Sequence, residues 1–120
     1  MTEKHSRIVN GQRAVWYSER LCELTRDLAV FSIEIARIAE FDENCWFDTS
    51  DQPTCRAVAE HARKIANADM RFPIILSSDG RLMDGGHRIA KAWLQGQKMI
   101  DAVQFETDPE PDYFVPIGYD

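Results

Sequence analysis

Hydrophobic and polar residues recur along the first half of the chain with the spacing of a helix and then of a strand. Leu21, Leu24 and Leu28 fall on one helical face after Ser18, which predicts a helix with Ser18 as its N-cap. Residues 31–37 alternate apolar and polar side chains, which predicts a half-buried strand.

A second helix is predicted to begin after Thr54, its expected N-cap. Val58, Ala62 and Ile65 follow at helical spacing and form its apolar face. Thr54 and His61 are seven residues apart and share a second stripe of the same helix. His61 therefore has two interpretations: it lines a pocket together with Thr54, or it is a solvated surface histidine.

The connection over residues 38–52 has no sustained period and mixes acids with large aromatic residues. A long connection of this kind often carries function in a compact domain. The alternative is structural, with Phe41, Trp46 and Phe47 covering one end of the core while the acids face water.

A hairpin is predicted where two short apolar runs, residues 72–76 and 81–84, flank Asp79 and Gly80. A third helix follows, with four expected buried residues and a glycine stop at Gly96. These four residues are Ile89, Ala90, Trp93 and Leu94. Residues 99–105 then predict a last strand.

The two ends of the chain differ from the middle. Residues 1–13 are polar without periodicity, and we expect a flexible segment over residues 1–17 ahead of one domain over residues 18–105. Residues 106–120 form an acidic, proline-interrupted tail that we expect to be extended. Its apolar residues, which include Tyr113 and Phe114, can dock on the body.

Composition and charge narrow the function classes. The chain has 120 residues, which corresponds to one domain, and 44% of them are hydrophobic. No stretch is long and apolar enough to suggest a membrane span or a signal peptide, so we expect a cytoplasmic protein without a membrane partner. The net charge of −6 argues against binding to nucleic acid, although a small phosphorylated ligand needs only a local positive site.

Such a local site is predicted at Gly85, Gly86, His87 and Arg88, where the hairpin ends and the third helix begins. The first backbone N–H groups of a helix have no intrahelical partner, and the helix dipole adds positive charge there. The glycine pair lets an anion approach these groups, and the histidine and arginine side chains lean back over the same point. The turn therefore predicts binding of a phosphate group.

Asp84 precedes this turn and would repel a bound phosphate. Two roles would remove the conflict. Asp84 is the N-cap of the third helix, or it bridges to Mg²⁺ or to a substrate hydroxyl. His87 and Arg88 also have a structural alternative, in which they pair with acids such as Asp84 or Asp79.

The order of these elements resembles the ParB/sulfiredoxin-like superfamily, the ParB-like nuclease domains, from about Phe31 to Phe105. The residues that carry the resemblance are Pro73-Ile74-Ile75-Leu76, Asp79-Gly80 and Asp84-Gly85-Gly86-His87-Arg88, with Ala90, Ala92, Leu94 and Gly96. The resemblance implies a single small α+β domain with a mixed four-stranded sheet and about three helices, and a turn that binds nucleotide phosphates.

Departures from the superfamily exclude two of its activities. Sulfiredoxins carry a catalytic cysteine in this turn, where the present chain has Gly86, so sulfinic acid repair is not expected. Partitioning ParB proteins continue into a helix-turn-helix, and the residues after Phe105 are too few for one.

The closest similarity in motif is to the ParB-like free serine kinases. They have an Asp-Gly-x-His-Arg turn and a catalytic carboxylate in the loop after the first strand, where this chain has Asp42 and Glu43. The similarity implies a phosphotransferase that uses ATP or ADP, or CTP, with Mg²⁺ and a small hydroxyl substrate, and with Glu43 or Asp42 as the base. The alternative is a noncatalytic nucleotide sensor whose acidic tail docks a protein partner.

Overall fold

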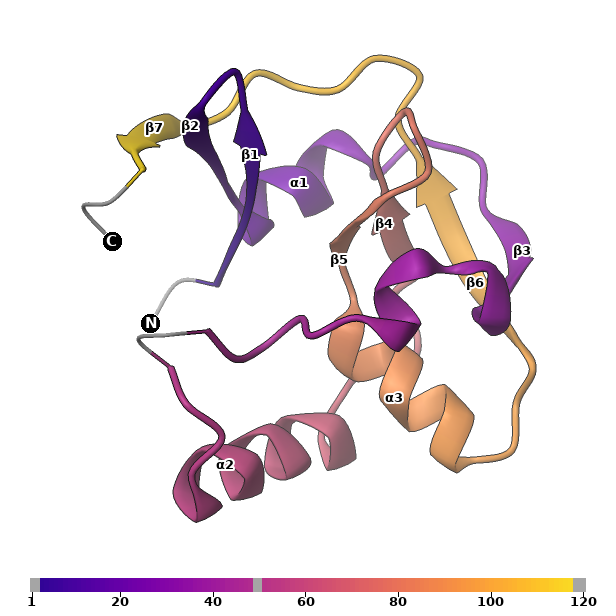
Figure 1. Cartoon of the computed structure of the whole chain (residues 1–120). Helices are drawn as coiled ribbons and strands as arrows, with labels where there is room; N and C mark the ends of the chain where they lie inside the picture. Colours follow the sequence, from indigo (N-terminus) through magenta and orange to yellow (C-terminus); the bar gives the residue numbers. More distant parts are fainter. Residues whose placement is uncertain (1–2, 49–50, 118–120) are drawn as a thin grey trace.

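A mixed four-stranded sheet forms the centre of the fold (Figure 1). We describe a computed structural model, and the description covers residues 3–48 and 51–117. The strand order is β3 (Phe31–Glu34), β6 (Met99–Gln104), β4 (Ile74–Leu76) and β5 (Leu82–Asp84). Only β4 and β6 are parallel; the β3–β6 and β4–β5 pairs are antiparallel. The predicted α+β class, with a mixed four-stranded sheet and three helices, is confirmed.

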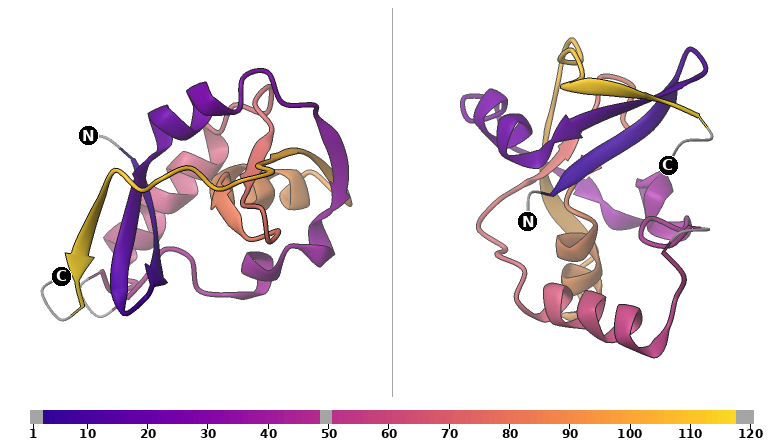
Figure 2. Two further views of the ribbon diagram at one scale, coloured as in Figure 1. Left: turned by 90° about the horizontal axis from the view of Figure 1, so that it is seen from above. Right: turned by 90° about the vertical axis from the view of Figure 1, so that its left-hand side faces the viewer.

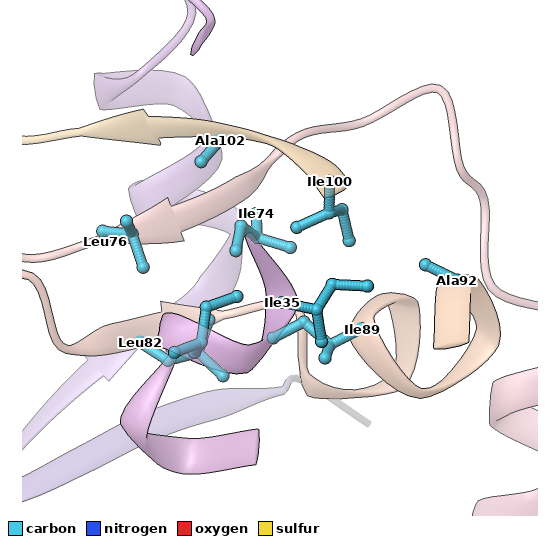
Figure 3. Close-up of a cluster of buried hydrophobic side chains, with 9 residues drawn as sticks. Ile35, Ile74, Leu76, Leu82, Ile89, Ala92, Ile100 and Ala102 are labelled. Carbon is cyan, nitrogen blue, oxygen red and sulfur yellow. The ribbon is translucent and has the colours of Figure 1, made fainter. Parts of the chain in front are cut away.

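One face of this sheet packs against α3 (Gly86–Leu94) and the 3₁₀ turn η1 (Ile35–Arg37) (Figure 3). The buried side chains of this core are Ile35, Ile38, Ile74, Leu76, Leu82, Ile89, Ala92, Ile100 and Ala102. Ile89 is buried as predicted, but Trp93 and Leu94 are 51% and 75% exposed and Ala90 is only half-buried. The buried face of α3 is therefore rotated toward Ala92, and the helix ends at Leu94 with Gly96 at φ +80° just beyond it.

The predicted flexible segment at residues 1–17 is wrong over the strands that it contains. β1 (Lys4–Val9) and β2 (Gln12–Tyr17) form an antiparallel hairpin around Asn10 and Gly11, both at positive φ. β7 (Tyr113–Pro116) pairs with the other edge of β2, so the tail docks on the body as a strand. These three strands form a second sheet, which the sequence pattern did not predict.

The second sheet and α1 (Ser18–Leu24) cover the other face of the central sheet (Figure 2). Side chains alternate along a strand, so Ile75, Met83 and Val103 point away from the first core and pack with residues of the hairpin. The residues that meet them are Ala14, Trp16, Leu21 and Phe105. In α1 only Leu21 is buried, whereas the predicted apolar neighbour Leu24 is 47% exposed. Ser18 is the first helical residue rather than a side-chain cap.

The predicted strand over residues 31–37 is too long. β3 stops at Glu34, and the chain continues through η1 and a second 3₁₀ turn, η2 (Ala39–Asp42). Phe41, at the end of this segment, packs against the core and lies 5.0 Å from Trp93 between ring centroids. The long connection therefore begins with a structural part that anchors it to α3.

Helix α2 (Cys55–Ala66) lies on the surface next to α3. Thr54 is its N-cap, as predicted, because its hydroxyl accepts a hydrogen bond from the N–H of Ala57 at 3.1 Å. No residue of α2 is buried, and Val58 on the predicted apolar face is 50% exposed. The helix instead turns His61 and Ile65 toward the body, where both are half-buried.

Acidic residues of the tail bind the body before β7 begins. Asp108 accepts a hydrogen bond from the N–H of Ser78, and Asp112 accepts one from the N–H of Tyr17 and pairs with Arg20. These contacts hold residues 108–112 against the N-terminal half of the chain. Within residues 3–48 and 51–117, no helix has both the length and the apolar character needed to cross a bilayer.

Candidate anion-binding cleft

The turn between β5 and α3 requires glycine at its first position. Gly85 has φ +123°, a conformation that other residues rarely adopt. A Cβ atom at this position would lie 2.5 Å from Cγ2 of Ile74, a residue that is fully buried in the core. The sharp change of direction from strand to helix is therefore built against the core rather than in an open loop.

Helix α3 begins with free backbone donors. The first N–H group with a backbone partner is that of Ile89, which donates to the carbonyl of Gly85 at 3.0 Å. Gly85 is the N-cap and supplies no side-chain bond. The N–H groups of Gly86, His87 and Arg88 have no hydrogen-bond partner within the described part of the chain. The predicted cluster of free donors at this turn is thus present.

The side chain of Arg88 is committed to the protein rather than to the open side of the turn. Its guanidinium donates to the carbonyls of Phe72 and Pro73 at 3.0 and 2.9 Å, and to Asp84 at 2.9 Å. The Arg88 and Asp84 side chains are only 12% and 19% exposed. Arg88 therefore fixes the turn to the segment before β4, which corresponds to the structural alternative for this residue.

Asp84 is not the N-cap of α3, so that predicted role is wrong. Burial raises the pKa of its carboxyl group, while the charge of Arg88 and the hydrogen bond from it act in the opposite direction. The positive charge of Arg88 balances the carboxylate of Asp84 and so reduces its repulsion of a phosphate at the turn. No group of three or more His, Cys, Asp or Glu side chains within residues 3–48 and 51–117 is placed to hold a metal ion.

His87 and His61 are brought together although they lie on different helices. Nδ1 of His61 is 2.8 Å from Nε2 of His87, and the ring of Trp46 stacks on both imidazoles with centroid distances of 4.8 and 4.7 Å. Phe47 contacts His61 edge-on. Burial first, and then the nearby His61 and Lys64, lower the pKa of His87. His87 is therefore neutral at pH 7, and one of the two rings donates to the other.

The free N–H groups open on a cleft of about 1120 Å³ that reaches from the turn to strand β1. Six of the predicted site residues line it, namely Glu43, Asp84, Gly85, Gly86, His87 and Arg88. Asp42, Thr54 and His61 are not among the described residues that line it. Thr54 serves only as a helix cap, and His61 lies behind Trp46 and His87.

Charged residues of both signs surround this cleft. Besides Arg88, four basic side chains from three parts of the chain line it: Lys4 and Arg7 on β1, Lys64 on α2 and Arg81 ahead of β5. Arg81 forms ion pairs with Glu40 and Glu43, and Lys64 lies 4.0 Å from Glu3. Lys4 forms no ion pair within the described residues and packs its ammonium over Tyr17 and Tyr113. An anion at the turn therefore meets lysine and arginine close by, whereas the loop side of the cleft is acidic.

Sequence reasoning missed two residues of the cleft wall, His5 and Glu40. His5 lies on β1 and packs against Trp16 with the two rings tilted by 33°, and burial followed by the charge of Arg7 lowers its pKa to about 4. Glu40 lies on η2, and its side chain is 12% exposed, against 50% for Glu43. No signal in the polar sequence before residue 10 separates His5 from a surface histidine, because only the hairpin brings it to the cleft.

Comparisons of the chain with protein-family models, with curated proteins and with solved structures returned no match.

Proposed function

We propose that this chain is a nucleotide-binding domain of the ParB/sulfiredoxin-like kind, which holds a phosphate group at the N-terminus of α3. The observation that carries the proposal is the set of three free N–H groups at Gly86, His87 and Arg88, which open on a cleft large enough for a nucleotide. Lys4 and Lys64 line the same cleft and supply positive charge. ATP or ADP are the expected ligands, with CTP as a further candidate and Mg²⁺ as their counterion.

The proposal assigns different roles to the residues of the turn. The backbone of Gly86, His87 and Arg88 binds the phosphate oxygens. The side chain of Arg88, tied to Asp84 and to two carbonyls, holds the turn in the geometry that presents those N–H groups. Trp46 lies beside Gly86, since its Nε1 is 3.2 Å from the position that a Cβ atom would take there. This ring offers a flat apolar surface at the edge of the phosphate site.

A titration of the isotope-labelled chain tests the binding. We expect ATP, ADP and inorganic tripolyphosphate to shift the backbone amide signals of Gly86, His87 and Arg88 in two-dimensional NMR spectra, because a hydrogen bond to an anion deshields the donor. Adenosine, which lacks phosphate, is expected to leave these three signals in place. Amide signals that do not respond to any phosphate compound would contradict the proposal.

A pair of lysine variants measures the role of the side chains. Lys4→Gln with Lys64→Gln is expected to weaken tripolyphosphate binding roughly tenfold at low salt, since two positive charges that line the cleft and attract the anion are lost. Lys98→Gln with Arg56→Gln is the matched control, because it removes the same number of positive charges from two exposed residues outside the cleft. Equal weakening in the control would mean that only net charge matters.

Phosphoryl transfer to a hydroxyl group is a second, finer proposal, favoured by the carboxylate of Glu43 in the same cleft. In that reaction the hydroxyl oxygen attacks the terminal phosphorus, its proton passes to Glu43, and the bond to the leaving phosphate breaks. Asp42 is a natural control because it belongs to the same segment but does not line the cleft.

Turnover measurements separate these roles. With ATP and a panel of small hydroxyl compounds, Glu43→Gln is expected to lower the rate of ADP release roughly 100-fold or more without changing ATP affinity. Asp42→Asn is expected to keep wild-type turnover. The same loss of rate in both variants would exclude Glu43 as the specific base. If no acceptor gave turnover, the phosphotransferase proposal would fail and only the binding proposal would stand.

A further inference from the structure

Two buried polar atoms on the wall of the cleft have no hydrogen-bond partner within the described chain. They are Nε2 of His5, on strand β1, and Oε1 of Glu40, on the turn η2. Both residues line the cleft that opens at α3. The charge of Glu40 acts on the imidazole of His5, so the two side chains are neighbours in the cleft wall. Burial of a polar atom without a partner costs free energy, and a ligand group that reaches both atoms would remove that cost.

The chemistry of the two atoms restricts that ligand. Glu40 already accepts a hydrogen bond from Nε of Arg81 on its other oxygen, so Oε1 is an acceptor that needs a donor. The pKa of His5 is lowered to about 4, mainly by burial, so its ring is neutral at pH 7. A neutral ring that carries its proton on Nε2 donates one hydrogen bond and needs an acceptor.

The charges around the pair argue for a neutral group. Arg81 already balances Glu40, and Arg7 and Lys4 lie on the same strand as His5, so an ammonium group would be repelled. A phosphate would be repelled by the carboxylate. A hydroxyl group is neutral, donates once and accepts, and so matches both atoms.

We infer that His5 and Glu40 form a hydroxyl-binding subsite, in which a ligand hydroxyl donates to Oε1 of Glu40 and accepts from Nε2 of His5. The inference rests on the proposed function, since it places this hydroxyl in the cleft that receives the phosphate. The hydroxyl belongs either to the ribose of the nucleotide or to a separate neutral substrate. The N-terminal hairpin then contributes to recognition directly.

The test compares ligands on the full chain with the histidine ring labelled for NMR. The probes are tripolyphosphate, ATP, 2′-deoxy-ATP and 3′-deoxy-ATP, and glycerol and D-ribose at high concentration. If the ribose is the source, one of the two deoxy nucleotides is expected to bind roughly ten- to a hundredfold more weakly than ATP. If a separate substrate is the source, the deoxy nucleotides bind as ATP does, and glycerol or ribose shifts the ring nitrogen signals of His5.

Two variants connect either result to the pair. His5→Phe keeps the aromatic contact with Trp16 but removes both nitrogens, and Glu40→Gln keeps the shape but removes the charge. Both are expected to abolish the preference for the hydroxyl while leaving tripolyphosphate binding at α3 within about twofold. Glu60→Gln, an exposed residue of α2 outside the cleft, is the control. Amide spectra of each variant verify the fold.

The failure of this inference differs from the failure of the proposed function. The hydroxyl subsite is overturned if the deoxy nucleotides bind as ATP does and no polyol shifts the signals of His5. Only water would then occupy it. Unresponsive amides at Gly86, His87 and Arg88 overturn the phosphate site instead. In that case the polyol titration alone decides, and a His5 shift in the wild-type chain that is lost in Glu40→Gln still supports the subsite.

Discussion

Replacing Arg88 with alanine is expected to destabilise the fold by about 3 kcal/mol, because it leaves the buried carboxyl group of Asp84 without its opposite charge. The substitution also removes the guanidinium group that donates hydrogen bonds to the carbonyls of Phe72 and Pro73. For a domain whose total stability is about 5–15 kcal/mol, this is a large fraction. Chemical denaturation of both proteins at pH 7 measures the difference.

The matched control for this change is Arg71→Ala. Arg71 also pairs with an aspartate, Asp69, but its side chain is 84% exposed, so water screens the pair and only a small change in stability is expected. Equal losses in both variants would contradict a structural role for Arg88. A double variant, Arg88→Ala with Asp84→Asn, is expected to recover part of the stability, since no buried charge is then left unpaired.

The loss in Arg88→Ala should also depend on pH. Burial already raises the pKa of Asp84 above its unfolded value, and removal of the arginine raises it further. Between the unfolded and the folded pKa of Asp84, the folded variant holds a proton that the unfolded chain releases. The stability of the variant therefore falls as the pH rises through this interval. We therefore expect a smaller deficit at pH 4 than at pH 7.

Replacing Gly85 with alanine is expected to cost about 2–4 kcal/mol. Roughly 1–2 kcal/mol comes from the left-handed backbone at φ +123°. The remainder comes from the added methyl group, which meets Ile74 at 2.5 Å and must displace a packed core side chain. Thermal or urea unfolding provides the measurement, and phosphate binding at the turn should weaken in parallel.

Gly11 offers a control that also has a positive φ but lacks the close neighbour. It has φ +79°, and a Cβ atom there would meet nothing within 4 Å. Gly11→Ala is therefore expected to cost only the backbone contribution, about 1 kcal/mol. If the two alanine variants lost the same stability, the close contact with Ile74 would not be the reason that this turn needs glycine.

The central sheet could be predicted because its signals are local. Asp79 and Gly80 stand between two short apolar runs, and the strands of the hairpin form on either side of them. The cap at Thr54 and the glycine stop at Gly96 are equally local and were both found. In each case a few neighbouring residues determine the backbone conformation, whatever the rest of the chain does.

The second sheet was missed although it has a local signal of its own. Asn10 and Gly11 are a favourable pair for a tight hairpin turn, and both adopt positive φ. The flanking strands are polar on their outer faces, however, and the partner β7 lies about a hundred residues away. Pairing at that separation leaves no periodicity in the sequence.

The helix faces were predicted with the right period, but the predicted burial of those faces was wrong. Val58 and Leu94 belong to apolar stripes, yet both are exposed, because periodicity shows which residues share a face and not what packs against it. The turn at residues 84–88 shows the same limit of sequence-based prediction. Its glycines were found from sequence, whereas the distant carbonyls that hold Arg88 could not be.

The wall of the cleft that carries His5 is expected to form late during synthesis of the chain. β1 pairs with β2, and β2 in turn pairs with β7, so closing this sheet joins segments about a hundred residues apart. Such distant pairings form slowly compared with local hairpins and helices. During synthesis, the turn at Gly85 can fold against the central sheet once residue 104 has left the ribosome. The opposite wall is complete only after residue 116, so a nascent chain can form the turn at Gly85 and helix α3 before the cleft around them is closed.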